Sequence, residues 1–289
     1  MKEYWIEEKE RWEKNLSYIS NSSMPMLESC REICRTFSIR RLSKIFQFAG
    51  PGEWGISFAK ALNAEVIIGD ISKRVATLAK IKLKHPIIIV FPIVLELYHW
   101  LEKEEKKALL RLSALKEGRK ILTKKDFSRK DITQLLECSK RVLECLLERS
   151  HHKEIFRKFI NDFCGGKIDC KSKMEGDALC LVGGHKNLPF KDNSFDMILL
   201  YEIDVIIPNR KVAESISKEL HRVCKKDGYV LYIPPPFIKD QTLVNALSGM
   251  FNEIELKKFE IKSYFARAGE VTVRKDSVIT TRKILAFKK

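Results

Sequence analysis

The most informative run in this 289-residue chain reads IFQFAGPGEWGISFAKALNAEVIIGD, from Ile45 to Asp70. Its first apolar residues are typical of a buried parallel strand, and the glycines of Gly50-Pro51-Gly52 predict a tight turn. Ile56–Leu62 then has helical spacing, and a second apolar run ends at Asp70. The run therefore predicts a strand–loop–helix–strand unit with a carboxylate at the tip of its second strand.

Such a unit has the chemistry of a nucleoside cradle. Gly50 and Gly52 allow the backbone to approach a ligand closely, and the following helix offers free N–H groups and a partial positive charge. Asp70, about 20 residues after Gly50, is placed to accept hydrogen bonds from ribose hydroxyls. Two ligands fit this loop, a dinucleotide such as NAD and S-adenosylmethionine, and the loop alone does not choose between them.

Composition and charge limit the class of protein. The chain is 45% hydrophobic and 32% charged, and no apolar run approaches the roughly 20 residues that span a bilayer, so we expect no membrane partner. The first residues carry acids and lack a continuous apolar core, which predicts a cytoplasmic protein. The net charge of +16 would attract RNA, although alternating acids and bases also fit an ordinary solvated surface.

The 8 cysteines include no Cys-x-x-Cys pair, and we expect most of them to be reduced packing residues. Cys164, Cys170 and Cys180 follow His151 and His152, but their spacing matches no standard zinc pattern, so no metal is expected.

The periodicity of the chain predicts three parts. Residues 1–43 form an N-terminal helical cover, residues 44–84 and 165–289 form a Rossmann-like domain, and residues 85–164 are a helical insertion. Within the insertion Ser128 and Asp131 have capping-box spacing before a long amphipathic helix. The insertion is either a lid over the substrate or a bracing bundle, and the sequence favours neither.

The second half of the chain separates the two ligand classes. It contains Gly176-Asp177-Ala178, then Leu188-Pro189-Phe190 before a strand over Phe195–Leu200, and a further strand at Tyr229–Ile233. Together with the glycine loop, this ordered set resembles class I S-adenosylmethionine-dependent methyltransferases of the small-molecule type. The resemblance implies an α/β fold with a doubly wound, mostly parallel seven-stranded sheet, closed by an antiparallel pair at 251–265 and 278–287.

The resemblance also implies how the cofactor S-adenosylmethionine is held. Gly50 and Gly52 would approach its amino-acid portion, and Asp70 would hold the ribose hydroxyls. Asp177, expected like Asp70 at the tip of its strand and close to it, would accept a hydrogen bond from the adenine amino group, with Ala178 beside the ring.

Tyr201 and Glu202 follow the fourth strand, and the resemblance places both near the methyl group and the substrate. If the acceptor must lose a proton, the candidates for the general base are Glu202, Asp204, His185 and Tyr201.

The chain departs from the family pattern in two places. Phe46 and Phe48 stand where the family has an acid and a further glycine, and the spacer Leu179–Lys186 is unusually long. The first departure removes an expected partner for the cofactor's ammonium group. We therefore expect a methyltransferase acting on a small molecule, with an RNA methyltransferase and a catalytically inactive binding protein as the alternatives.

Overall fold

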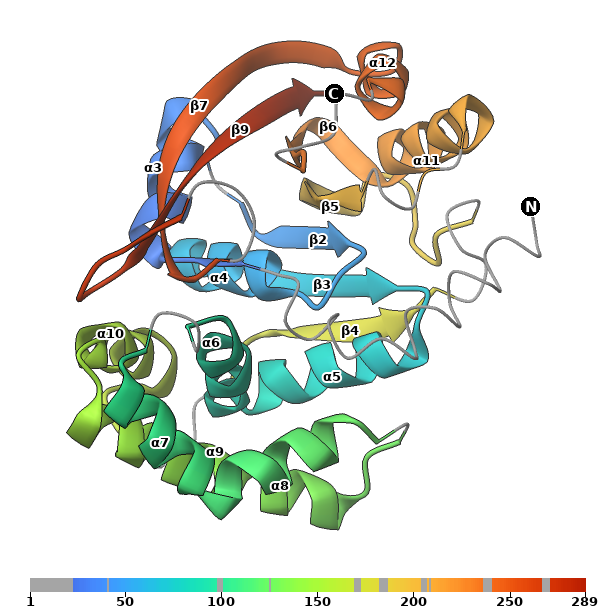
Figure 1. The fold of residues 1–289 in the computed structure, drawn as a ribbon. Helices are drawn as coiled ribbons and strands as arrows, with labels where there is room; N and C mark the ends of the chain where they lie inside the picture. Colours follow the sequence, from blue (N-terminus) through green and yellow to red (C-terminus); the bar gives the residue numbers. More distant parts are fainter. Residues whose placement is uncertain are drawn as a thin grey trace.

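A nine-stranded sheet forms the centre of the computed structural model (Figure 1), which describes residues 23–40, 42–97, 101–124, 126–168, 173–181, 187–203, 207, 209–235, 241–266 and 271–289. The strands follow the order β1-β7-β9-β6-β5-β2-β3-β4, and β8 pairs with β9. Their bounds are β1 Met24–Pro25, β2 Lys44–Phe48, β3 Glu65–Asp70, β4 Gly176–Cys180, β5 Phe195–Tyr201, β6 Cys224–Ile233, β7 Asn252–Phe265, β8 Val271–Val273 and β9 Val278–Lys288.

Five neighbouring strands of the sheet, in the order β6-β5-β2-β3-β4, are parallel, and this order is that of a doubly wound sheet. The chain starts at β2 and moves outward through β3 and β4, then returns to add β5 and β6 on the other side of β2. The order of the strands therefore reverses between β2 and β5, and ligands of such sheets bind outside the carboxyl ends of the strands at this switch point.

The remaining strands close the sheet as the sequence predicted. β9 runs antiparallel to both β6 and β7, so the expected antiparallel pair is confirmed. β1 and β8 are short additions to the seven strands that were expected. The predicted fold class, a Rossmann-like α/β domain, is thus confirmed by the topology.

Helices cover both faces of the sheet because the buried strands are apolar on both sides. One face carries α3 (Leu27–Thr36), α4 (Glu53–Leu62) and α5 (Lys73–Lys84), and the other carries α11 (Arg210–Val223) and α12 (Thr242–Ser248). Of the expected N-terminal helical cover, α3 lies among the described residues, whereas residues 1–22 lie outside them.

The expected insertion between α5 and β4 is helical. It consists of η1 (Pro86–Ile89), α6 (Val90–Leu97), α7 (Lys103–Arg111), α8 (Ser113–Leu122), α9 (Arg129–Arg149) and α10 (Lys153–Cys164). The predicted capping box is present at the start of α9, where Ser128 and Asp131 cap one another's backbone. The exact domain limits stay a prediction.

The placement of the insertion favours the bracing alternative over the lid. Its buried side chains, Leu143 and Phe156 among them, belong to the same core cluster as Val66 and Ile68 of β3. In Figure 1, α7 and α10 lie near the amino ends of β3 and β4, away from the arrowheads where ligands of this topology bind. No helix among the residues described is long and apolar enough to cross a bilayer.

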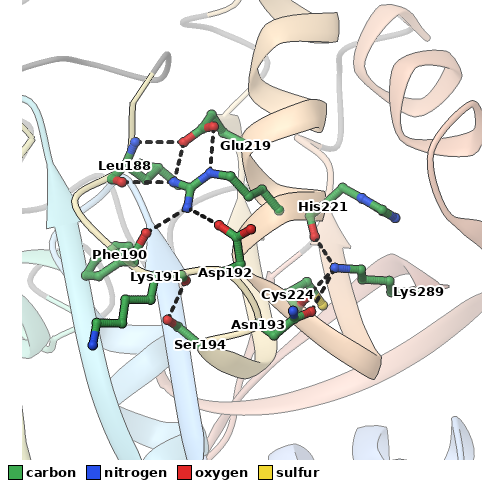
Figure 2. Close-up of polar contacts among 11 residues, drawn as sticks. Leu188, Phe190, Lys191, Asp192, Asn193, Ser194, Glu219, His221, Cys224 and Lys289 are labelled. Carbon is green, nitrogen blue, oxygen red and sulfur yellow. Dashed lines mark hydrogen bonds and ion pairs between the residues drawn. The ribbon is translucent and has the colours of Figure 1, made fainter.

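The Leu188-Pro189-Phe190 turn is clamped by charged side chains of α11 (Figure 2). Arg222 donates to the carbonyl oxygens of Leu188 at 3.0 Å and Phe190 at 2.7 Å, and it pairs with Asp192 at 2.8 Å. Glu219 accepts the N–H of Leu188 at 2.8 Å, and its hydrogen bond with Arg222 lowers the pKa of the Glu219 carboxyl. The turn that precedes β5 in the chain is therefore held in place by α11, the helix that follows β5.

We predict that Arg222→Ala lowers the free energy of unfolding by about 2–3 kcal/mol, because it leaves the carbonyls of the turn without their charged donor. Arg210→Ala on the same helix is the matched control, since Arg210 pairs with Glu214 on an exposed surface and such pairs contribute about 0–1 kcal/mol. Urea denaturation of both variants measures the difference. Equal effects of the two substitutions would contradict the role given to Arg222.

Candidate functional site

The glycine loop lies at the switch point of the sheet, between β2 and α4. Ala49, Gly50 and Gly52 all have positive φ, at 65°, 88° and 93°. A Cβ at Gly52 would lie 2.5 Å from Cδ1 of Ile68, closer than real Cβ atoms come to their neighbours. The backbone angle therefore favours glycine at position 52, and a larger residue would also have to displace the Ile68 side chain.

Asp70 ties this loop to the neighbouring strand. It ends β3, is 3% exposed, and accepts the N–H of Gly50 and the N–H of Ser72, each at 2.8 Å. The carboxylate therefore fixes the loop after β2 and the start of α5 together. Each carboxylate oxygen has further lone pairs, so the side chain retains the capacity to accept ribose hydroxyls.

A buried ion pair between Lys82 and Glu53 contacts the backbone of the glycine loop. Lys82 of α5 donates to Glu53, the first residue of α4, and to the carbonyl of Pro51 at 3.3 Å, and both charged side chains are almost fully buried. The second carboxylate oxygen of Glu53, Oε2, is also buried and has no hydrogen-bond partner among the described residues. A buried carboxylate oxygen without a donor is costly, and it marks a place where a ligand donor such as an ammonium group would be stabilised.

Gln47 of β2 is a residue beside the glycine loop that the sequence reasoning missed. Its Oε1 accepts the N–H of Gly55 at 2.6 Å, and its Nε2 donates to the carbonyl of Ala49 at 3.1 Å, so the side chain bridges the two ends of the glycine loop. Phe46 and Phe48, which stand where the family has an acid and a further glycine, lie in the core on the α11 side of the sheet. The sequence did carry a signal for Gln47, because it is a polar residue between two phenylalanines of an apolar strand.

The structure does not place Asp177 beside Asp70. On the edge strand β4, Asp177 pairs in register with Ile67, whereas Asp70 pairs with Cys180. The two carboxylates are therefore offset by three residues, or about 10 Å at 3.3 Å per residue. The expectation that they meet at the strand tips is wrong, because Gly176–Cys180 is itself the strand and not the loop after it.

Asp177 instead forms a surface ion pair with Lys80 at 2.8 Å, in which both side chains are about half exposed. Ala178 is buried and packs into the core on the α4 side of the sheet. Residues 182–186, which follow the true carboxyl end of β4, lie outside the described residues. The adenine contacts proposed for Asp177 and Ala178 are therefore not supported by this geometry.

Tyr201 does lie at the predicted edge, at the carboxyl end of β5 next to the switch point. Its ring stacks on Trp54 of α4 with centroids 5.3 Å apart, and its hydroxyl lies 3.0 Å from the Ser23 hydroxyl, which also accepts the Trp54 N–H at 3.0 Å. Burial raises the pKa of the Tyr201 hydroxyl, so this group stays protonated and is a poor general base.

Glu202 is the described carboxylate that follows β5. Its φ of 51° is unusual for a residue with a side chain, and its N–H is fixed by the carbonyl of Ile233 at 2.9 Å. An oxygen of Glu202 lies 3.0 Å from Nη2 of Arg282. Of the other candidates for the general base, Asp204 and His185 lie outside the described residues.

The comparisons with known proteins agree with this topology. Residues 160–232, from α10 into β6, match the family model described as a methyltransferase domain. No curated protein matches the chain. The match and the strand order confirm the resemblance to class I S-adenosylmethionine-dependent methyltransferases.

Solved structures with a similar arrangement have low sequence identity. A methyltransferase from Methanosarcina mazei, titled as S-adenosylmethionine-dependent, is 12% identical with a TM-score of 0.45, covering 89% of this chain and 96% of its own. The N-methyltransferase NodS from Bradyrhizobium japonicum, solved with S-adenosyl-L-homocysteine, is 8% identical with a TM-score of 0.44, covering 99% and 98%. At these values the likeness adds nothing to the argument from the strand order.

We predict that Lys82→Met lowers the free energy of unfolding by about 3–5 kcal/mol, because it leaves the Glu53 carboxylate buried without a counter-charge. The double variant Glu53→Gln/Lys82→Met should be more stable than Lys82→Met alone, since it removes both charges. Urea denaturation measures each variant.

The matched control is Lys80→Met on the same helix, where the partly exposed pair with Asp177 contributes about 0–1 kcal/mol. Strictly additive effects of Glu53→Gln and Lys82→Met would show that the two side chains do not act as a pair.

Proposed function

We propose that this chain, which carries a methyltransferase domain, is an S-adenosylmethionine-dependent methyltransferase that acts on a small molecule. The observation that carries the proposal is the contact between Asp70 and Gly50 at the switch point of the sheet. It joins a strained glycine loop to a buried carboxylate at the edge where doubly wound sheets bind nucleosides.

The residues of the site fit the donors and acceptors of S-adenosylmethionine. Asp70 has lone pairs for the ribose hydroxyls, and neither Gly50 nor Gly52 has a side chain to obstruct the ligand. The orphaned Oε2 of Glu53 would accept the ammonium of the amino-acid portion, a role that the family gives to an acid on the preceding strand. When bound, the cofactor supplies an electrophilic methyl group, and orientation is the main task left to the protein.

The acceptor side of the site is formed by residues after β5. Glu202 is a carboxylate held by its own backbone and by Arg282, so it is positioned to take a proton from an acceptor that must lose one. Tyr201 and Trp54 form the aromatic wall beside it. This small buried cluster is the reason for preferring a small molecule over RNA as the acceptor.

RNA remains the alternative acceptor because of the net charge of +16. The described surface does not favour RNA as the acceptor, since exposed basic side chains alternate with acidic ones along β7. For example, exposed Lys258 and Lys262 lie on either side of exposed Glu260.

We predict that Asp70→Ala weakens S-adenosylmethionine binding about tenfold or more, because it removes a charged acceptor and releases the Gly50 loop. Isothermal titration calorimetry of the wild type and the variant measures the change. Asp177→Ala is the matched control and should leave the dissociation constant unchanged, because Asp177 lies toward the amino end of β4.

No binding by the wild type would contradict the proposal, and so would equal binding by Asp70→Ala. A loss on Asp177→Ala alone would restore the original assignment of the adenine contact.

We predict that methyl label from S-adenosylmethionine enters the small-molecule fraction of a cell extract and not its RNA. The label is counted in the small-molecule and RNA fractions of the extract. The Glu202→Gln variant tests whether Glu202 is needed as a general base. Label in RNA would support the RNA methyltransferase alternative. Cofactor binding without transfer to either fraction would support the inactive binding protein.

A further inference from the structure

A buried arginine lies beside the acceptor side of the site, and the proposed function gives it no role beyond holding Glu202. Arg282 of β9 is 2% exposed and pairs in register with Phe259 of β7. Along β9 it lies three residues before Leu285, which pairs with Tyr232 near the carboxyl end of β6. Because β9 is antiparallel to β6, Arg282 projects past the carboxyl end of β6, at the edge of the sheet where the glycine loop also lies.

The guanidinium of Arg282 is only partly used by the protein. Its Nη2 pairs with Glu202 at 3.0 Å and donates to the Tyr201 hydroxyl at 3.4 Å, and its central carbon lies 6.0 Å from the centroid of the Tyr201 ring. Its Nε and Nη1 are buried and have no hydrogen-bond partner among the described residues. A buried charged donor without an acceptor is strongly destabilising, so such a group is expected to have a partner that the described residues do not supply.

The surroundings of Arg282 connect it to the glycine loop. Tyr201, which receives the Arg282 hydrogen bond, stacks on Trp54, and Trp54 is the second residue of the helix that follows the loop. Ser23 bridges the Trp54 N–H and the Tyr201 hydroxyl. Ser23 and Trp54 are thus linked to this guanidinium through Tyr201, which lies next to the positive-φ backbone of Glu202.

We propose that Nε and Nη1 of Arg282 bind a carboxylate group of the methyl acceptor, so that the acceptor is a small carboxylic acid. This inference rests on the proposed function, because it describes the second substrate of the same site. Arg282 presents planar donors that match carboxylate geometry. Glu202 already supplies one negative charge to this guanidinium, so a singly charged carboxylate is less costly here than a doubly charged phosphate.

The test uses two pairs of probes that differ in charge and hardly in shape, benzoate with benzamide and acetate with acetamide. Ligand-observed NMR titrations are run on the full chain saturated with S-adenosyl-L-homocysteine. In the wild type we expect at least one carboxylate to bind about tenfold more tightly than its amide, a free-energy difference of about 1.4 kcal/mol. In Arg282→Gln we expect this preference to be lost.

Two further variants keep the test specific. Lys283→Gln removes the exposed positive charge next in the chain and should retain the full preference for the carboxylate. Glu202→Gln removes the competing negative charge and should increase the preference, which gives a readout even if Arg282→Gln does not fold. Calorimetric binding of S-adenosyl-L-homocysteine by each variant should match that of the wild type.

The proposal is overturned if neither carboxylate is preferred over its amide by the wild type, or if folded Arg282→Gln retains the preference. Either result would mean that Nε and Nη1 have a partner other than a carboxylate of the acceptor. If S-adenosyl-L-homocysteine itself fails to bind the wild type, the proposed function has failed. In that case the same titrations are run without cofactor. Loss of the preference for carboxylate over amide in Arg282→Gln would still support the role of Arg282, and its retention would contradict that role.

Discussion

The hydrogen bond from the Gly50 N–H to the Asp70 carboxylate is the contact on which the candidate site depends. It joins the loop after β2 to the tip of β3, and the second oxygen of Asp70 joins both to the start of α5 through Ser72. Three segments that leave the same edge of the sheet are thereby held in one arrangement. Positive φ at Ala49 would be unfavourable in a free loop, because alanine carries a Cβ, and these contacts help to keep it.

Buried polar groups surround this contact, and several of them are incompletely paired. Lys82 and Glu53 form an ion pair beneath the loop, and Arg282 approaches the end of β5. Within the described part of the chain, Oε2 of Glu53 and Nε and Nη1 of Arg282 have no hydrogen-bond partner. The two orphaned groups have opposite charge. One lies at the start of α4 and the other at the end of β5, on the two sides of the switch point. A cofactor and an acceptor that meet between them would give each group its missing partner.

Local signals in the sequence predicted the part of the site that a single unit forms. The glycine loop, the helix after it and the acid at the end of the next strand lie within one stretch of 26 residues from Ile45 to Asp70, and each has a direct physical signature. The register of β4 was not predictable in this way. It is an edge strand reached after a long insertion, so nothing near Asp177 in the sequence fixes which residue is level with Asp70.

Long-range pairing explains the other residues that the sequence did not reveal. Arg282 stands in a strand-like segment rich in bases, and only the pairing of β9 with β6 and β7 brings it to Glu202, 80 positions earlier in the chain. Lys82 is one of several lysines on α5, and its burial follows from the packing of α5 against α4 and the glycine loop. Gln47 was visible as a polar residue in an apolar strand, yet its role depends on where Gly55 returns to it.

A crystal structure with S-adenosyl-L-homocysteine bound tests the central claim most directly. The account predicts that the ribose hydroxyls lie within hydrogen-bonding distance of Asp70, at the edge formed by the glycine loop, and that Asp177 makes no contact with the ligand. A nucleoside held elsewhere on the chain, or one whose ribose does not touch Asp70, would contradict it.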